Sequence, residues 1–218
     1  MRQRAFGQYC GLARALEVVG ERWALLIVRD LLVRPRRYTD LHEGLPGIPT
    51  NVLSGRLKEL ENAGVIERRL LPPPERSVVY ALTDSGRELD DAVLRLARWG
   101  AGRLDDPRPG EVVTAESLVM ALRSTFRPES AVKVSATWEI HADDIAFYAR
   151  VANGELDAGV GLSPEKPDLV ITMSPTGPPP LKALMTGELS PDEAVAEGLV
   201  QLAGKTRLMP IFVKVFRI

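Results

Sequence analysis

One helix decides how the chain folds, and it is predicted by Ile48-Pro49-Thr50-Asn51-Val52-Leu53-Ser54-Gly55-Arg56-Leu57-Lys58-Glu59-Leu60-Glu61-Asn62-Ala63-Gly64. The leucines of this stretch recur at helical spacing and form an apolar stripe. Its opposite side is polar and narrow enough to lie in a DNA major groove. Pro49 or Thr50 is expected to begin the helix and Gly64 to end it. An ordinary surface helix is the alternative, so the flanking sequence must decide.

The flanks predict a helix-turn-helix followed by a hairpin. Thr39 is a suitable N-cap for a short helix that ends at Gly44, and Leu45-Pro46-Gly47 has the composition of a turn. A short helix, a tight turn and an amphipathic helix in series form a helix-turn-helix. Two strand-like segments follow at 65–71 and 77–82, which together predict a β-hairpin, or wing.

The remaining periodicities predict two domains. Helices are expected at 9–19, 21–33 and 84–103, and the charged, proline-containing segment 105–110 is the best linker. The second half predicts helices at 113–126, 181–185, 191–197 and 207–216, with strands at 131–140, 145–151, 155–160, 168–173 and 199–203. The fold class is therefore α+β, with domains at 1–104 and 111–218.

The composition excludes several classes of protein. Net charge is −1 over 218 residues, although residues 1–105 carry 17 Lys+Arg against 14 Asp+Glu. One cysteine excludes an internal disulfide framework and is typical of the reducing cytoplasm, where we expect the protein. No signal peptide is visible, and no apolar run approaches the roughly 18 residues of a membrane span. With two distant histidines, no phosphate loop and no nucleophile elbow, we expect neither an enzyme nor a metal or cofactor site.

The first half resembles the HxlR-type winged-helix regulators. The motifs are Cys10…Leu16-Glu17-Val18-Val19-Gly20-Glu21-Arg22-Trp23, Pro35-Arg36-Arg37-Tyr38-Thr39-Asp40-Leu41 and Leu45-Pro46-Gly47-Ile48, followed by Leu53-Ser54-Gly55-Arg56-Leu57-Lys58-Glu59-Leu60-Glu61. The resemblance implies a homodimer whose two recognition helices read double-stranded operator DNA. It also implies that the helices at 9–19 and 84–103 form the dimer interface, with Trp99 in it.

The second half looks like a sterol-carrier-protein type-2 domain, on Val151-Ala152-Asn153-Gly154-Glu155-Leu156, Asp168-Leu169-Val170-Ile171-Thr172 and Thr186-Gly187-Glu188-Leu189-Ser190-Pro191-Asp192-Glu193-Ala194. That resemblance implies a mostly antiparallel sheet and a cavity for a lipid or another apolar small molecule. Fused to a DNA-binding domain, such a cavity implies an effector sensor. Most apolar residues are simply core, and the effector-binding candidates are Trp138, Phe147, Leu184, Met185 and Phe212.

Three groups of residues are candidates for contact with DNA. Asn51 can pair bidentately with adenine, and Thr50, Ser54 and Lys58 share its side of the recognition helix. The other two groups precede the motif or lie on the wing, where phosphate contact is expected: Arg36, Arg37, Tyr38 and Thr39, then Arg68, Arg69 and Arg76. For Arg56, on the core side of the helix, a salt bridge and a DNA contact are equally plausible.

Cys10 is a candidate redox sensor, because some relatives of this type sense electrophiles or oxidants through a cysteine near this place. Arg14, one helical turn on, could lower the pKa of its thiol. The alternative is an inert, half-buried small side chain.

The sequence leaves two further functions open. The protein could be a carrier of lipid or another apolar ligand whose winged helix serves dimerisation or protein contact. It could also be a constitutive repressor with a structural C-terminal domain.

Overall fold

The computed structural model describes residues 5–105, 107–174 and 180–218, and its contacts divide the chain into two compact units, Met1–Val93 and Leu94–Ile218. The sequence predicted a division at 105–110, of which Asp106 lies outside the described residues. The observed division falls earlier, inside a helix. Arg98, in the part of this helix that belongs to the second unit, donates to the backbone carbonyl oxygens of Ser124 and Phe126.

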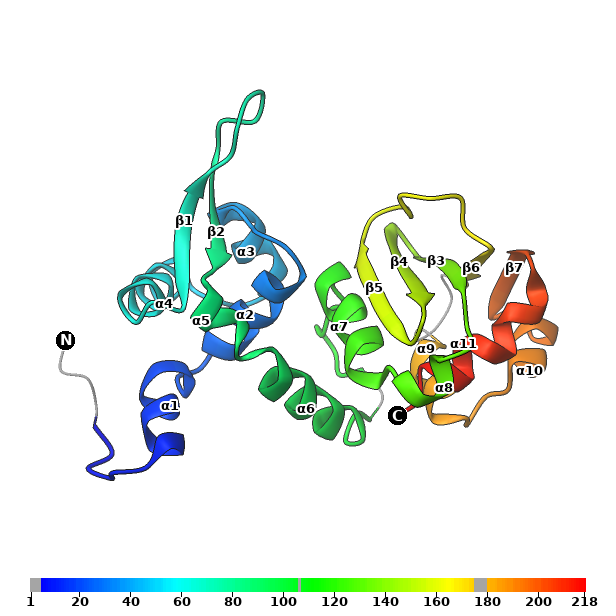
Figure 1. Cartoon of the computed structure of the whole chain (residues 1–218), viewed down its shortest axis with the longest axis horizontal. Helices are drawn as coiled ribbons and strands as arrows, with labels where there is room; N and C mark the ends of the chain where they lie inside the picture. Colours follow the sequence, from blue (N-terminus) through cyan, green and yellow to red (C-terminus); the bar gives the residue numbers. More distant parts are fainter. Residues whose placement is uncertain (1–4, 106, 175–179) are drawn as a thin grey trace. The chain divides into compact units, whose positions relative to one another are not determined.

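The N-terminal unit is a helical domain from which a hairpin projects (Figure 1). Along the chain, its helices and strands are α1 Gly11–Val19, α2 Ala24–Val33, α3 Tyr38–Gly44, α4 Thr50–Asn62, β1 Ile66–Leu70, β2 Val78–Leu82, α5 Asp84–Arg87 and α6 Asp90–Ala101, the last of which continues into the second unit. The two strands pair antiparallel, with Ile66 opposite Leu82. This arrangement confirms the helix-turn-helix and the hairpin that the sequence predicted.

Several predicted boundaries in this unit are wrong. Helix α2 begins at Ala24 rather than Glu21, because Trp23 takes a left-handed conformation with φ 80°. The N-cap of α3 is Arg37, so Thr39 lies inside the helix. The predicted helix 84–103 is two helices. Its first turn, α5, packs so closely on the residue before β1 that a Cβ on Gly86 would lie 2.0 Å from the carbonyl oxygen of Val65.

The C-terminal unit combines a five-stranded sheet with short helices. Along the chain, they are α7 Ala115–Thr125, α8 Pro128–Ala131, β3 Ala136–Ala142, β4 Ile145–Ala152, β5 Glu155–Val160, β6 Leu169–Met173, α9 Leu181–Thr186, α10 Pro191–Ala196, β7 Val200–Gly204, a 3-10 turn Thr206–Leu208 and α11 Met209–Val215. The strand predicted from residue 131 begins only at Ala136. Pro128 is well suited to the first turn of a helix and starts α8 there instead.

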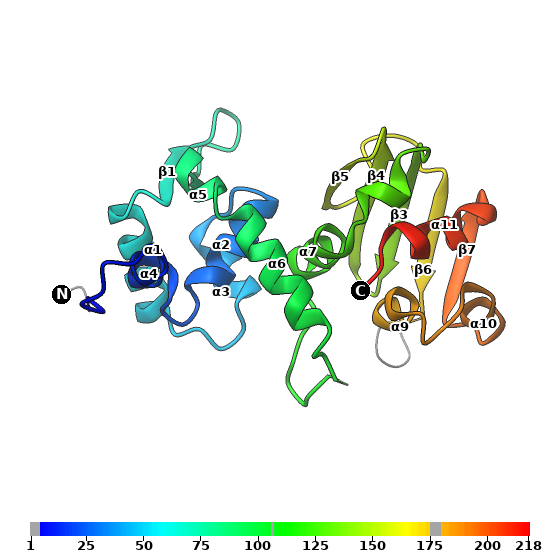
Figure 2. The ribbon, with the colours of Figure 1, turned by 60° about the horizontal axis from the view of Figure 1, so that its bottom comes forward.

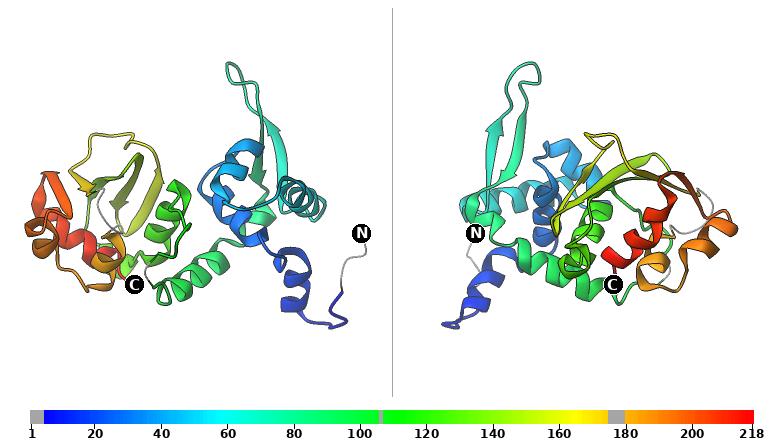
Figure 3. Two further views of the ribbon diagram at one scale, coloured as in Figure 1. Left: turned by 180° about the vertical axis from the view of Figure 1, so that it is seen from behind. Right: turned by 45° about the vertical axis from the view of Figure 1, so that its right-hand side comes forward.

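The described sheet is mixed, and three of its four strand pairs are antiparallel. Its strand order is β5-β4-β3-β6-β7, and β3 pairs parallel with β6 while the other pairs are antiparallel. Helices cover one face, as the ribbon views show (Figures 2 and 3). The segment 161–168 passes over the other face, where the backbone N–H of Ser163 donates to Glu139 Oε2 at 2.9 Å.

Within the described ranges, no helix is both long and apolar enough to cross a bilayer. The same residues contain no group of three His, Cys, Asp or Glu side chains that could hold a metal ion.

Candidate nucleic-acid interface

The helix-turn-helix is held by apolar side chains from both of its helices. Leu41 of α3 and Leu53, Leu57 and Leu60 of α4 are each at most 2% exposed, which confirms the leucine stripe. The turn between the helices requires Gly47, whose φ of +80° few other residues adopt readily. One side of α4 is thereby fixed against the core, and the other side must face solvent.

The solvent side of α4 carries the predicted base-reading residues. Thr50, Asn51, Ser54 and Lys58 are all exposed, and a Cβ added to Gly55 would meet nothing within 4 Å. Thr50 does not cap the helix through its side chain, because the N-cap is Pro49 and no side-chain cap bond forms. The face is therefore polar, flat and unobstructed within the unit.

Tyr38 forms hydrogen bonds with the first turns of α4. Its hydroxyl donates to the carbonyl oxygen of Thr50 at 2.9 Å and accepts from Ser54 Oγ at 3.3 Å. Ser54 Oγ also lies 2.9 Å from that carbonyl oxygen. The Tyr38 ring stacks on His42 with centroids 6.4 Å apart. Tyr38 and Ser54 thus connect α3 to the first turns of α4.

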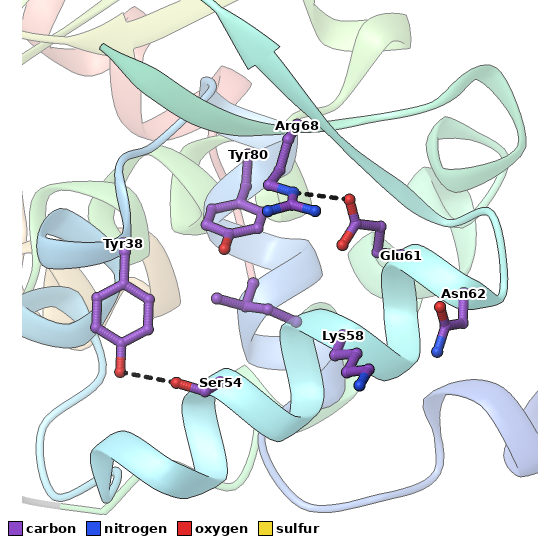
Figure 4. A pocket seen from close by; sticks show the side chains of 8 residues that line it. Tyr38, Ser54, Lys58, Glu61, Asn62, Arg68 and Tyr80 are labelled. Atoms are coloured by element: carbon purple, nitrogen blue, oxygen red, sulfur yellow. Dashed lines mark hydrogen bonds and ion pairs between the residues drawn. The ribbon is translucent and has the colours of Figure 1, made fainter.

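A hollow of about 430 Å³ lies between α4 and the hairpin (Figure 4). Helix α4 forms one wall, and strands β1 and β2 contribute the opposite wall. Its lining residues are Tyr38, Ser54, Leu57, Lys58, Glu61, Asn62, Arg68 and Tyr80. The hollow joins the predicted base-reading helix to the predicted phosphate-contacting wing.

Two of the three wing arginines are already paired with carboxylates. Arg68 Nε donates to Glu61 Oε1 at 2.9 Å, and this carboxylate raises the pKa of the Arg68 guanidinium. Arg69 Nε donates to Glu67 Oε1 at 2.6 Å. The third wing arginine, Arg76, is exposed at the hairpin tip. All three stand on the hairpin as predicted, but two of them are neutralised there.

Arg36 and Arg37 are adjacent, yet they occupy opposite environments. Arg36 is only 7% exposed, and its Nη2 donates to the carbonyl oxygen of Asp40 at 2.7 Å. Its burial argues against the predicted phosphate contact and indicates a structural role. Arg37 is exposed, with its Nε 3.0 Å from Ser77 Oγ and its Nη2 3.6 Å from Glu75. Thr39 is also exposed.

Arg56 forms salt bridges, which is one of the two alternatives that the sequence left open. Its Nη2 lies 3.1 Å from Glu21 Oε2, and its Nη1 pairs with Glu59. The side chain is 20% exposed. Arg56 therefore ties α4 to the segment before α2.

Cys10 is exposed and is the N-cap residue of α1, without a side-chain cap bond. The guanidinium of Arg14, which the sequence offered as an activating neighbour, bonds Glu17 Oε2 at 2.8 Å. This bond lowers the pKa of the Glu17 carboxyl. Arg14 is therefore engaged by a carboxylate, and a redox role for Cys10 stays a prediction.

The effector candidates are buried in the C-terminal core. Trp138, Phe147, Leu184, Met185 and Phe212 are each at most 1% exposed. The Trp138 ring packs edge-on against Phe212, with centroids 5.8 Å apart, and its indole N–H donates to the carbonyl oxygen of Leu208 at 3.3 Å. Burial of all five side chains is typical of a core, and their role in binding an effector stays a prediction.

Sequence reasoning missed the acidic partners of Arg37, Arg68 and Arg69. Glu67 and Arg69 are two residues apart on one strand, so strand periodicity could have paired them. Glu61 meets Arg68 across a helix-to-strand turn, and Glu75 meets Arg37 across 38 positions of sequence. Local sequence patterns do not predict these two contacts.

A solvent-facing helix in a helix-turn-helix, beside an arginine-bearing hairpin, defines a DNA-binding protein of the winged helix-turn-helix class. The chain belongs to the HxlR-like helix-turn-helix family, whose model matches residues 18–107. Its relatives are transcriptional regulators, and this family membership confirms the resemblance of the first half.

YvaP of Bacillus subtilis is 35% identical over 92 residues, which are 42% of this chain and 85% of YvaP. YodB of the same organism is 33% identical over 102 residues, 47% of this chain and 88% of YodB. A regulator of Mycobacterium tuberculosis is 44% identical over 99 residues, 45% of this chain and 60% of its own length. Among solved structures, the oxidized redox regulator HypR is 28% identical with a TM-score of 0.41, covering 44% of this chain and 99% of HypR.

Proposed function

We propose that the protein is a homodimeric, ligand-responsive transcriptional regulator rather than an enzyme. Its N-terminal unit binds double-stranded operator DNA, and its C-terminal unit binds an apolar small molecule that changes the affinity for DNA. The observation that carries the DNA-binding part is the exposed polar face of α4 beside the wing. Because a regulator must share a compartment with its operator, we place the protein in the cytoplasm.

The residues of the interface divide into three roles. Asn51 reads a base edge in the major groove, since its amide can bond adenine bidentately. Contacts to phosphate come from Lys58, Arg37, Arg68, Arg69 and Arg76, which are exposed cations on α4, at the start of α3 and on the wing. Tyr38 and Ser54 position the first turns of α4 through their bonds to the Thr50 carbonyl.

A salt-dependent shift assay tests DNA binding. The full chain selects a duplex from a random library, and its affinity for that duplex is measured from 50 to 300 mM NaCl. Asn51→Ala should cost about 1–3 kcal/mol and relax the preference at one base pair, while Lys58→Ala should weaken all duplexes evenly. If the wild-type chain selects no sequence, DNA binding is refuted and the alternative of a ligand carrier gains support.

The dimer is supported by apolar side chains that each unit leaves exposed. Leu12 and Leu16 on α1 are 68% and 40% exposed, and Leu96 and Trp99 on α6 are 52% and 61% exposed. Exposed large apolar side chains at helical spacing are typical of an interface. Sedimentation equilibrium of the full chain should give twice the monomer mass of 23.9 kDa. A monomer at micromolar concentration would contradict the proposal.

The effector part is supported by the resemblance of the second half to a sterol-carrier domain. The apolar, helix-covered side of the sheet is the place where such a ligand would lie. Native mass spectrometry of the purified chain should find an apolar molecule that denaturation releases. A ligand-free chain whose DNA affinity is unaffected by an apolar extract of the producing cells would favour a structural C-terminal domain.

A further inference from the structure

The hollow beside the recognition helix contains a carboxylate where an approaching DNA backbone would be expected to meet only cations. Glu61, on the last turns of α4, lines it together with Lys58 and Arg68. The Glu61 carboxylate accepts the Nε–H of Arg68 at 2.9 Å, and Figure 4 shows this bond joining helix to strand. A phosphate that binds Arg68 must therefore compete with Glu61 or lie next to it.

The same pairing recurs around the interface. Arg69 bonds Glu67 at 2.6 Å, and Arg37 lies 3.6 Å from Glu75. Of the described cations that we propose to contact phosphate, Lys58 and Arg76 are not paired with a carboxylate, so their charge is not offset. Most of the positive charge that the fold directs at DNA is therefore balanced inside the protein.

When cations of the interface are paired with carboxylates of the protein, the part of DNA binding that is independent of sequence becomes weaker. That part comes from cations that displace counterions from phosphates, and each uncompensated cation steepens the salt dependence. A carboxylate and a phosphate accept the same charge-assisted bond from a guanidinium. A fixed carboxylate at Arg68 thus lowers the attraction to every duplex equally, whereas base contacts from Asn51 keep their full value.

We propose that Glu61 holds down the sequence-independent part of DNA binding by neutralising Arg68 in the hollow where a backbone phosphate docks. Glu61 is chosen over the other two carboxylates because it stands on the recognition helix itself. Its side chain is also the least exposed, at 32% against 45% for Glu67 and 59% for Glu75, so solvent screens it least. The inference rests on the proposed DNA-binding function.

The test compares Glu61→Gln with wild type on two duplexes. One is the duplex that the wild-type chain selects from a random library, and the other is its scrambled counterpart of equal length. Glutamine keeps the size of the side chain and an oxygen that can accept from Arg68, but it removes the charge. We expect Glu61→Gln to bind the scrambled duplex about 3–10-fold more tightly, with a salt slope steeper by about one. The affinity for the selected duplex should rise by a similar factor, because both duplexes present the same phosphates.

Two further variants test whether the effect depends on the pairing of Glu61 with Arg68. Glu197→Gln removes the same charge from an exposed site in the C-terminal unit and should leave both affinities unchanged. In an Arg68→Gln background, Glu61→Gln should give a smaller gain, because only the direct repulsion between the carboxylate and the phosphate is then removed. Thermal unfolding of each variant shows that it is folded.

The outcomes separate this inference from the proposed function. Unchanged or weaker binding of the scrambled duplex by Glu61→Gln overturns it, and so does an equal gain in the Arg68→Gln background. Either result leaves DNA binding itself intact as long as the wild-type chain still selects a duplex. A wild-type chain that binds neither duplex overturns both.

Discussion

Arg36 and Arg37 offer a sharp test of how the interface is built, because they are neighbours with the same charge. We expect Arg36→Ala to destabilise the N-terminal unit and Arg37→Ala to weaken DNA binding. Arg36 is 7% exposed and bonds the Asp40 carbonyl oxygen at 2.7 Å. Its backbone also pairs with Tyr80 in both directions, at 3.0 and 2.7 Å.

The loss of stability expected for Arg36→Ala depends on a buried carboxylate near Arg36. Asp30 is 0% exposed, and a Cβ built on Gly44 would lie 3.2 Å from Asp30 Oδ2 and 3.6 Å from Arg36 Nη2. Both charged groups therefore border one small space. Arg29 Nη2 stays 2.8 Å from Asp30 Oδ1, so removing Arg36 takes away only part of the compensation of this carboxylate. The cost is therefore at most the roughly 3–5 kcal/mol of a buried charge left without its partner. That is a large fraction of the roughly 5–15 kcal/mol that stabilises a domain.

Arg37 serves as the matched control. Its side chain is 47% exposed and its partner Glu75 is 59% exposed, so the pair contributes at most about 1 kcal/mol. Arg37→Ala should leave the urea midpoint nearly unchanged. If Arg37 contacts a phosphate, the variant should also lower the salt slope of DNA binding by about one.

Equilibrium urea unfolding of the full chain, followed by circular dichroism, measures the first effect, and the salt-dependent shift assay measures the second. An Arg36→Ala variant with an unchanged urea midpoint and a lower salt slope would refute the reasoning. In that case Arg36 would be a phosphate ligand despite its burial, as the sequence alone suggested.

Three further predictions concern other parts of the chain. Arg98→Ala removes two hydrogen bonds, of 2.6 and 2.9 Å, to carbonyl oxygens at the end of α7. Thermal unfolding should therefore show that the C-terminal unit is less stable by roughly 1–2 kcal/mol. Arg95→Ala, on the same helix, is the control and should leave the stability unchanged. If Cys10 is a sensor, Cys10→Ser keeps DNA affinity but loses the response to a thiol-reactive agent. An unchanged response in the shift assay would contradict a sensing role. The bond from Lys205 Nζ holds the pKa of the Asp168 carboxyl below its usual 3.8, which adds stability above that pH and loses it as pH falls through the lowered pKa. Asp168→Asn should therefore unfold at lower urea than wild type at pH 5–7, and the difference should shrink below about pH 4; a constant difference down to pH 2 would contradict the assignment.

The helix-turn-helix was predictable because local signals agree with tertiary structure there. The leucine stripe of α4, the turn at Gly47 and the antiparallel strands after Gly64 each follow from short-range pattern. Boundaries failed where a distant contact overrode the pattern. Val132 fits an alternating strand, for example, yet it is 64% exposed and follows α8 rather than lying in β3.

The interface was predictable by residue type but not by environment. The sequence placed arginines before α3 and on the wing, and the structure has them there. It could not tell that Arg36 is buried while Arg37 is exposed, since the two are chemically identical neighbours. Nor could it find the pairing of Arg68 with Glu61, because that contact depends on how β1 packs beside α4. Charge patterns in sequence thus overstate the cationic character of this surface.

The packing of the C-terminal unit constrains how an effector could act. Trp138 and Phe212 are at most 1% exposed and lie against Phe216, which in turn packs on Phe126 with centroids 5.9 Å apart. A ligand that enters among these rings must displace some of them, because close-packed side chains leave little spare volume. The carbonyl oxygen of Phe126 accepts from Arg98 Nη2 of α6, the helix that continues into the N-terminal unit. Displacement of the aromatic core would therefore reach α6 through this bond, and it would alter DNA affinity only if the ligand binds the two arrangements with different affinity.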